Sequence, residues 1–430
     1  MAISGRFVVL LALGIVPTVL LDSALALWIW IAAVVLLTAL DLLLAASARL
    51  VTLRRTVPAR LRLGETVSSE LVVTNTGRRT LRALVRDAWQ PSAGAGVTRA
   101  RLTIPVGERR AMTTLLTPFR RGERAAAHVT VRSFGPLGLA ARQATLSAPA
   151  VLRVLPPFNS RKHLPSRLAR LRELDGRTSV MIRGQGTEFD SLREYVRGDD
   201  VRSIDWRATA RRNDLVVRTW RPERDRRVVI VIDSGRTSAA RIDNEPRIDT
   251  AFESALLLAA LASRAGDRVD VVIFDRRVRG RVQGATGADL MSRLVDTMAP
   301  IDPELIEMDW AAVPALVRSV TSQHSLVVLA TSIDAPGASH GLLAVLPQLT
   351  RKHTVVVASV TDPSVLAATL ERSDRTEVYR AAAAERSLLD VARVSAAIRQ
   401  LGAEVVTGAP ADLPPALSDT YIALKAAGRL

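Results

Sequence analysis

The sequence contains no cysteine among its 430 residues, and aromatic residues make up only 4 % of it. The absence of cysteine excludes disulfides, thiolate metal sites and cysteine nucleophiles. Because aromatic side chains are scarce, any core must consist mainly of Leu, Val, Ile and Ala. The five histidines are scattered along the chain, which argues against a zinc site built from several histidines.

Positive charge is abundant and unevenly distributed. The formal net charge is +17, and residues 51–150 carry 17 basic side chains against 5 acidic ones. Such an excess is typical of proteins that meet nucleic acid or an anionic membrane surface. Because the basic segment directly follows the apolar N-terminus, its position favours anionic lipid head groups.

Two apolar runs lie near the N-terminus, at residues 7–21 and 24–40, with Asp22 and Ser23 between them. A cleaved signal peptide is one interpretation of the first run. The second run follows at once, so we expect a transmembrane helical hairpin over residues 1–50. Arginines before and after the hairpin predict that both of its ends face the cytoplasm. For Asp41 we expect a place near the membrane interface, and a functional carboxylate within the membrane is the alternative.

Residues 51–155 show short alternating apolar and polar runs, separated by turn signals such as Asn75-Thr76-Gly77. This pattern predicts an antiparallel β-sandwich-like domain. No catalytic set of residues occurs in it, so a structural or interaction module is the better interpretation. Residues 156–226 then form a linker, with a short helix expected over residues 165–174.

Residues 227–430 alternate between strand and helix patterns, which predicts an α/β doubly wound domain with a mostly parallel sheet. The expected strands are residues 228–233, 268–274, 278–282, 325–331, 354–360 and 404–407. The expected helices are residues 248–264, 287–298, 310–320, 342–349, 381–401 and 413–425.

Two carboxylates follow expected strands of this domain, Asp233 and Asp334, and ligands bind at such strand ends. Residues 233–237 read Asp-Ser-Gly-Arg-Thr, which resembles the Asp-x-Ser-x-Ser metal-ion-dependent adhesion site of von Willebrand factor type A domains. The resemblance implies that Asp233, Thr237 and Asp334 bind Mg²⁺ in a degenerate site. Gly235 removes one ligand, and Arg236 adds a cation that could pair with either carboxylate. Thr286 is a guess for the family's separate threonine, and the alternative role of Asp233 is to cap the following turn.

The segment from residue 184 to residue 211 is dense in Gly, Arg, Asp and aromatic residues. It reads GQGTEFDSLREYVRGDDVRSIDWRATAR. This signature block, with its neighbours, resembles the bacterial domain-of-unknown-function family 58. The residues that carry the resemblance are Gly184, Gly186, Glu188, Phe189, Arg193, Glu194, Tyr195, Gly198, Asp199, Asp200, Arg202, Ile204, Asp205, Trp206, Ala210 and Arg211.

Considered by itself, the signature block alternates acidic residues with arginines. Arginine–carboxylate pairs are planar and bidentate, so a salt-bridged brace against the sheet is the first interpretation. A partner-binding surface is the second and catalysis the third. The block lacks a P-loop lysine, which argues against nucleotide binding.

The family resemblance implies a partner of the MoxR-type AAA+ ATPases. We therefore expect a non-enzymatic adaptor in the inner membrane, with its soluble domains in the cytoplasm and with the bilayer, the ATPase and client proteins as partners. One alternative is a metal-dependent hydrolase that uses Asp233 and Asp334. The other is nucleic-acid binding by the basic β domain, but no specific nucleic acid is expected because the domain lacks interleaved aromatic residues.

Overall fold

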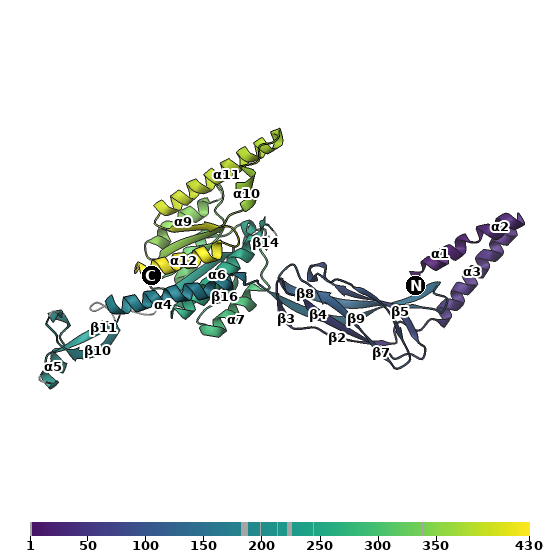
Figure 1. Ribbon diagram of the computed structural model, residues 1–430, viewed down its shortest axis with the longest axis horizontal. Coiled ribbons are helices and arrows are strands. Elements are labelled where there is room, and N and C mark those ends of the chain that lie inside the picture. Colours follow the sequence, from purple (N-terminus) through teal and green to yellow (C-terminus); the bar gives the residue numbers. More distant parts are fainter. Residues whose placement is uncertain are drawn as a thin grey trace. The chain divides into compact units, whose positions relative to one another are not determined.

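The computed structural model describes residues 2–181, 188–197, 199–212, 214–221, 226–243, 245–337 and 339–430. The chain forms two compact units, unit 1 (Met1–Leu155) and unit 2 (Pro156–Leu430). Figure 1 shows the elements of each unit in chain order.

Unit 1 begins with strand β1 and three apolar helices. Their bounds are β1 Ala2–Ile3, α1 Gly5–Ala12, α2 Ile15–Leu21 and α3 Ala24–Leu44. Helices α1 and α2 both pack on α3, and the Trp30 indole donates a hydrogen bond of 3.0 Å to the Leu10 carbonyl. Asp22 turns the chain with φ of 40°, a left-handed conformation that aspartate tolerates.

The N-terminal prediction of two spans is confirmed only in part. Among the described residues, α3 is the one helix long and apolar enough to cross a membrane. The first apolar run is divided into α1 and α2, so neither reaches the roughly 20 residues that a span requires.

Asp41 of α3 is fully buried and binds the loop that joins β8 to β9. Its carboxylate accepts hydrogen bonds from the backbone N–H groups of Leu137, Leu139 and Ala140 at 2.8, 2.8 and 3.3 Å. A Cβ at Gly135 would lie 2.1 Å from Asp41 Oδ1, so only glycine fits there. Asp41 therefore holds the last turn of α3 on the β-strands of unit 1.

The rest of unit 1 consists of two sheets, and their antiparallel pairing confirms the prediction for this part of the chain. The larger sheet has the order β1-β9-β8-β5-β6, with β3 beside β9 as a parallel strand, and the smaller has the order β2-β4-β7. The bounds are β2 Val51–Thr56, β3 Arg60–Arg62, β4 Val67–Asn75, β5 Leu81–Trp89, η1 Pro91–Ala93, β6 Arg99–Ile104, β7 Arg109–Leu116, β8 Gly122–Phe134 and β9 Ala140–Leu155.

Alternate side chains of these strands point inward, and those of both sheets pack together in two hydrophobic clusters. One charged pair lies inside this unit. Arg55 of β2 contacts Asp87 of β5, and both side chains are almost completely buried. Trp89 Nε1 donates a hydrogen bond of 3.0 Å to Asp87, and the Arg55 guanidinium lies over the Trp89 ring at 5.3 Å. Burial raises the pKa of Asp87 and lowers that of Arg55, and their mutual attraction opposes both shifts.

Unit 2 contains a six-stranded sheet with the order β16-β15-β12-β17-β18-β19. All neighbouring strands are parallel except β15 and β16. The bounds are β12 Arg227–Asp233, β15 Arg268–Phe274, β16 Val278–Val282, β17 Leu326–Ala330, β18 Thr354–Val360 and β19 Glu404–Gly408. The central strands are continuous apolar runs because both of their faces are covered.

Helices cover both faces of this sheet (Figure 1). On one face α8, α9 and α11 bury apolar side chains against β12, β17 and β18. Helix α6 packs on β12 and β15 from the other face, with α12 and α4 beside it, and is therefore buried around most of its circumference. The bounds are α4 Leu164–Met181, α6 Arg247–Arg264, α7 Gly287–Met298, α8 Val313–Val320, α9 His340–Thr350, α10 Pro363–Ala368, α11 Arg375–Gln400 and α12 Leu413–Ala426.

Several short elements complete unit 2. They are η2 Asn159–His163, β10 Glu188–Glu194, η3 Val201–Ser203, α5 Trp206–Arg212, β11 Val216–Arg221, η4 Arg236–Ala239, β13 Arg241–Ile242, β14 Glu245–Pro246 and η5 Trp310–Ala312. The sequence did not predict α10 or the pairing of β10 with β11, and it placed the start of α11 at residue 381. The helix expected over residues 165–174 continues to Met181 as α4.

Candidate functional site

The carboxyl ends of three neighbouring strands of the unit 2 sheet carry aspartates. Asp233 ends β12 and is 2 % exposed. Its Oδ1 accepts a hydrogen bond of 2.7 Å from the Gly235 N–H, and its Oδ2 accepts one of 2.7 Å from Thr331 Oγ1. Thr237 Oγ1 lies 3.5 Å from the same Oδ2. The protein itself therefore supplies the donors that surround this carboxylate.

Burial raises the pKa of Asp233 above its ordinary value. The donors at Thr331, Gly235 and Thr237 act in the opposite direction, and the nearby charge of Asp275 adds to the rise. The fold thus favours the protonated form of Asp233.

Asp334 follows β17 and is bound by an arginine. Arg247, the first residue of α6, places its Nη1 3.4 Å from Asp334 Oδ1, and Ser332 Oγ donates a hydrogen bond of 2.8 Å to Oδ2. A cavity of about 20 Å³ lies beside Arg247 and has room for one water molecule. It is lined by Ser238, Arg247, Ala251, Ser254, Ala330, Thr331, Ser332, Ala358, Val360 and Leu413.

The prediction that Arg236 could pair with Asp233 or Asp334 is wrong. Its Nε lies 2.8 Å from Glu307 Oε1 and its Nη2 lies 2.5 Å from the same atom. The backbone N–H of Arg236 also donates to the Ile306 carbonyl at 2.8 Å. A Cβ at position 235 would lie 2.8 Å from that carbonyl oxygen, so the segment around Ile306 requires glycine there and a serine ligand does not fit.

Two residues of this site were not predicted from the sequence. Asp275 follows β15, is fully buried, and accepts hydrogen bonds from Arg279 Nε and from the N–H groups of Arg276 and Arg277. Burial raises the pKa of Asp275, but these donors outweigh it and hold the pKa below its ordinary value. Its position directly after an apolar strand was a usable signal. The other member is Thr331, whose role depends on the pairing of β12 with β17.

The residues present do not fit the Mg²⁺ site that the adhesion-site resemblance implies. Asp233 is engaged by hydroxyl and N–H donors, and Asp334 already faces a cation. Thr286 precedes α7 and belongs to another loop. Within the described parts of the chain, no three His, Asp or Glu side chains form a group that could hold a metal ion. The arrangement is a set of carboxylates neutralised by arginine, hydroxyl and N–H groups.

Strand β10 of the signature block pairs with β11, which follows the block, in a small antiparallel hairpin. Gly184, Gly186 and Gly198 lie outside the described residues, and Glu188 and Phe189 begin β10. Elements η3 and α5 lie between β10 and β11 in the chain. Backbone bonds close the turn, from the Tyr195 N–H to the Leu215 carbonyl at 2.8 Å and from the Asp205 N–H to the Val216 carbonyl at 2.9 Å.

Ion pairs join segments of the block to one another and to β11. Arg193 binds Asp199 through two bonds of 2.6 and 2.8 Å, and Arg218 Nε binds Asp205 at 2.8 Å. Hydrogen bonding to Asp199 raises the pKa of Arg193, and hydrogen bonding to Arg218 lowers the pKa of Asp205. The Arg193 and Asp199 side chains are 39 % and 21 % exposed, so solvent screens this pair and it adds about 1 kcal/mol at most.

Asp205 also caps the start of helix α5, which begins at Trp206. Its Oδ1 accepts the N–H groups of Arg207 and Ala208 at 3.0 and 3.1 Å. Asp200 performs a similar role for η3 by accepting the Arg202 N–H at 2.9 Å. Arg211 lies in α5, on the exposed surface. The acidic residues of the block thus fix the local backbone.

Large apolar side chains of the block and of the residues just after it face solvent on this fixed backbone. Trp206 is 68 % exposed, Val201 63 %, and Val196 62 %. Large exposed apolar groups are typical of protein–protein contacts when they gather in one segment. We name Val196, Val201, Trp206 and Leu215 the exposed apolar set.

Residues 191–401 match the model of the family described as "Protein of unknown function DUF58". This segment belongs to the DUF58 family. It contains most of the signature block and every strand of the unit 2 sheet except β19. Helices α1–α3 and the two sheets of unit 1 lie outside the matched DUF58 segment.

The curated relatives of this chain include uncharacterized proteins of Mycobacterium tuberculosis (strain ATCC 25618 / H37Rv) and Mycobacterium bovis (strain ATCC BAA-935 / AF2122/97). Each is 26 % identical over 185 residues, which is 43 % of this chain. The chain spans about half the length of these relatives, because the matched part is 57 % of each.

Solved structures similar to parts of the chain include a CARDB domain from Pyrococcus furiosus, with a TM-score of 0.18 and 15 % identity over 24 % of this chain and 94 % of that domain. Another is the PKD domain of an M14-like peptidase from Thermoplasmatales archaeon SCGC AB-540-F20, with a TM-score of 0.17 and 14 % identity. It covers 26 % of this chain and 95 % of that domain. At these TM-scores the likenesses carry no conclusion about fold or function.

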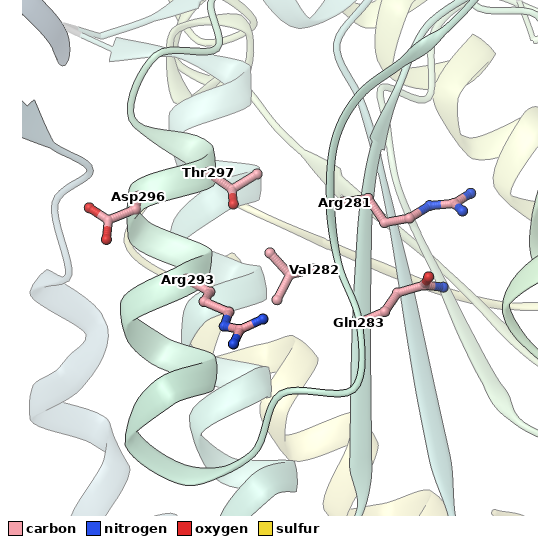
Figure 2. A pocket seen from close by; sticks show the side chains of 6 residues that line it. All are labelled: Arg281, Val282, Gln283, Arg293, Asp296 and Thr297. Atoms are coloured by element: carbon pink, nitrogen blue, oxygen red, sulfur yellow. The ribbon is translucent and has the colours of Figure 1, made fainter.

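The DUF58 segment also has an open hollow of about 530 Å³ at the edge of its sheet (Figure 2). Val282 points from the sheet edge toward α7, from which Arg293 and Thr297 project, whereas Arg281 and Gln283 point away from α7. The hollow lies outside the set of residues that the sequence predicted as a site.

A pH-dependent prediction follows from the opposite pKa shifts of Asp233 and Asp275. The raised pKa of Asp233 means that the fold favours its protonated form, so its contribution to stability is lost as the pH rises through the folded-state pKa. We expect Asp233→Asn, which cannot ionise, to gain stability relative to the wild type progressively as the pH rises above about 4, the ordinary pKa of an aspartate. Chemical denaturation of the full chain at a series of pH values measures this.

Asp275→Asn is the matched control at the same sheet end. The lowered pKa of Asp275 means that its charged form stabilises the fold above the unfolded pKa and loses this effect as the pH falls. Asp275→Asn should therefore be less stable than the wild type at neutral pH and approach it in acid. Equal pH profiles for the two variants would contradict the assignment.

Proposed function

We propose that the chain is a membrane-anchored cytoplasmic adaptor that binds a MoxR-type AAA+ ATPase through the signature block. The observation that carries the proposal is the exposed apolar set on its hydrogen-bonded frame. A tryptophan at the start of a capped helix is expensive to leave in water, and tryptophan is enriched among residues that dominate protein interfaces. The half-exposed ion pairs favour this role over a buried brace.

The membrane part of the proposal is supported by α3 and by the helices packed on it. We propose that α1 and α2 together enter the bilayer beside α3 as a hairpin. Arg6, Arg49 and Arg54 flank the hairpin, whereas its turn carries Asp22. By the positive-inside rule, this distribution of charge supports a location of both units on the cytoplasmic side of a bacterial inner membrane.

A von Willebrand factor A-like role for the unit 2 sheet is also part of the proposal. Its support is the strand order, in which the chain moves from β12 outward to β15 and β16 and then from β17 outward to β18 and β19. Loops at such a reversal are the usual ligand-binding place of doubly wound sheets. Because a metal does not fit at this end, we propose that the domain presents client proteins without a metal ion.

Replacing Trp206 by Ala tests the adaptor proposal. We expect the full chain, solubilised in detergent, to bind a purified MoxR-type ATPase encoded in the same genome in the presence of ATP. Trp206→Ala should weaken this binding at least about tenfold, because truncation of a central interface tryptophan costs about 2 kcal/mol or more. Biolayer interferometry with the immobilised full chain measures the affinity of the wild type and of Trp206→Ala for the ATPase.

Phe119→Ala is the matched control, since Phe119 is 62 % exposed but lies in unit 1. It should bind the ATPase as the wild type does. The proposal fails if wild-type chain and ATPase do not bind, or if Trp206→Ala and Phe119→Ala bind with equal affinity.

A further inference from the structure

The outward face of the larger unit 1 sheet carries a group of five exposed arginines: Arg82, Arg86, Arg99, Arg101 and Arg132. The strand register places them together. Arg101 of β6 and Arg132 of β8 both pair with Leu84 of β5, one from each side. Arg86 of β5 lies directly opposite Arg99 of β6, and Arg82 is two residues before Leu84 on the same face. We name these five residues the arginine face.

Acidic side chains do not offset this charge. Over residues 82–86, 99–103, 128–132 and 143–147, the other outward positions are Leu84, Thr103, His128, Thr130, Gln143, Thr145 and Ser147. The acidic residue of β5, Asp87, points into the core and contacts Arg55. Like charges directly opposite one another, such as Arg86 and Arg99, destabilise a sheet. An anionic ligand that covers the face removes this cost.

The arginine face begins beside the end of α3. Arg132 lies three residues before Gly135, so about 10 Å of extended chain separates these two residues. Gly135 in turn lies against Asp41 of α3. Arg82 lies three residues after Arg79, whose Nη1 donates a hydrogen bond of 2.6 Å to the Leu43 carbonyl in the last turn of α3. Arg86 is about 14 Å farther along β5 than Arg82. All five arginines therefore lie within reach of the interface where α3 leaves a bilayer.

We propose that the arginine face binds the anionic phospholipid head groups of the membrane that α3 enters. Clusters of basic residues next to a membrane-spanning helix attract anionic lipid, with roughly a fivefold gain in partitioning for each residue. A flat face of arginines with threonine, serine and glutamine between them can meet many phosphate groups at once. The face lacks the row of aromatic side chains on which single-stranded nucleic acid stacks. The proposal shares with the adaptor function only the membrane anchor, and it does not depend on Trp206.

The absence of cysteine permits a direct test with one labelled position. Thr103→Cys places an environment-sensitive fluorophore on the arginine face, and Thr113→Cys places it on the outward side of the smaller sheet. The full chain is reconstituted in nanodiscs of phosphatidylcholine, with or without about 30 % phosphatidylglycerol, and a head-group spin label serves as quencher. We expect at least about a twofold increase in quenching at position 103 in the anionic discs, removed by about 0.5 M salt because exposed charges are then screened. The quenching of a fluorophore at position 113 should be the same in discs with and without phosphatidylglycerol.

Charge variants decide whether the arginines cause the response. A triple variant that combines Arg86→Gln, Arg99→Gln and Arg101→Gln should abolish the increase in quenching at position 103. The matched triple variant Arg54→Gln, Arg109→Gln and Arg110→Gln on the smaller sheet removes the same charge and should retain it. Equal responses of the two triple variants, or equal quenching at positions 103 and 113, would overturn the proposal.

A single-stranded oligonucleotide of thymidines, tested in the same discs, distinguishes the other class of anionic partner. If it changes the fluorescence at position 103 and anionic lipid does not, the face binds nucleic acid and the lipid proposal is wrong. ATPase binding separates this inference from the proposed function. The arginine-face variant should still bind the ATPase, and Trp206→Ala should still respond to anionic lipid.

Discussion

Asp41→Ala is expected to destabilise unit 1 by about 3–5 kcal/mol, because it leaves the N–H groups of Leu137, Leu139 and Ala140 buried or half-buried without their acceptor. An unsatisfied buried donor costs about 1–3 kcal/mol, and three of them depend on this one carboxylate. Amide hydrogen exchange of the full chain in detergent should show faster exchange at these three positions. Chemical denaturation gives the loss in the free energy of unfolding.

Glu123→Ala is the control for this variant. Glu123 forms an exposed ion pair with Arg153 in the same unit, and such pairs contribute about 1 kcal/mol at most. If Asp41→Ala changes stability no more than Glu123→Ala, the carboxylate does not hold the loop. Gly135→Ala provides a second measurement, since its Cβ would overlap Asp41 and should disturb the same amides.

Arg55→Ala is expected to cost unit 1 about 3–5 kcal/mol, because it leaves Asp87 in the core without its cation. The side chain also contacts the Trp89 ring and the Ala148 carbonyl, so its removal opens a space in the core. Thermal and chemical denaturation of the full chain in detergent measure the effect. Arg110→Ala, which breaks an ion pair exposed on both sides, should change stability by about 1 kcal/mol at most.

The double variant Arg55→Ala with Asp87→Ala tests the physical reason. If the cost arises from an unpaired buried charge, removing both partners should be less harmful than the sum of the two single changes. Additive effects would show that the two side chains act through packing alone.

The parallel strands of the unit 2 sheet could be predicted closely because most of them are short apolar runs between polar residues. Strand β15 and helix α7 have the predicted bounds, Arg268–Phe274 and Gly287–Met298. Helix α11 begins earlier than predicted, at Arg375, since its first turns lack apolar periodicity and project beyond the core. The usable signal was the cap, in which Asp374 accepts the Glu377 N–H at 2.8 Å.

The predicted site could be located only in part. The positions of Asp233 and Asp334 after their strands follow from local sequence. Their partners do not, because Thr331 reaches Asp233 across a strand pair and Arg247 reaches Asp334 from a helix start 87 residues away in the chain. In the same way, no local pattern connects Arg236 to Glu307. Pairings between distant residues require the topology of the sheet.

The contact between Asp41 and Gly135 also has an evolutionary consequence. A side chain at position 135 would overlap both the carboxylate and the backbone carbonyl oxygen of residue 41, so a smaller residue at position 41 would not make room for it. Position 135 should therefore remain glycine among relatives that keep both the apolar helix and the β8–β9 loop, whichever residue stands at position 41. Relatives that lack the helix should be free to lose the glycine.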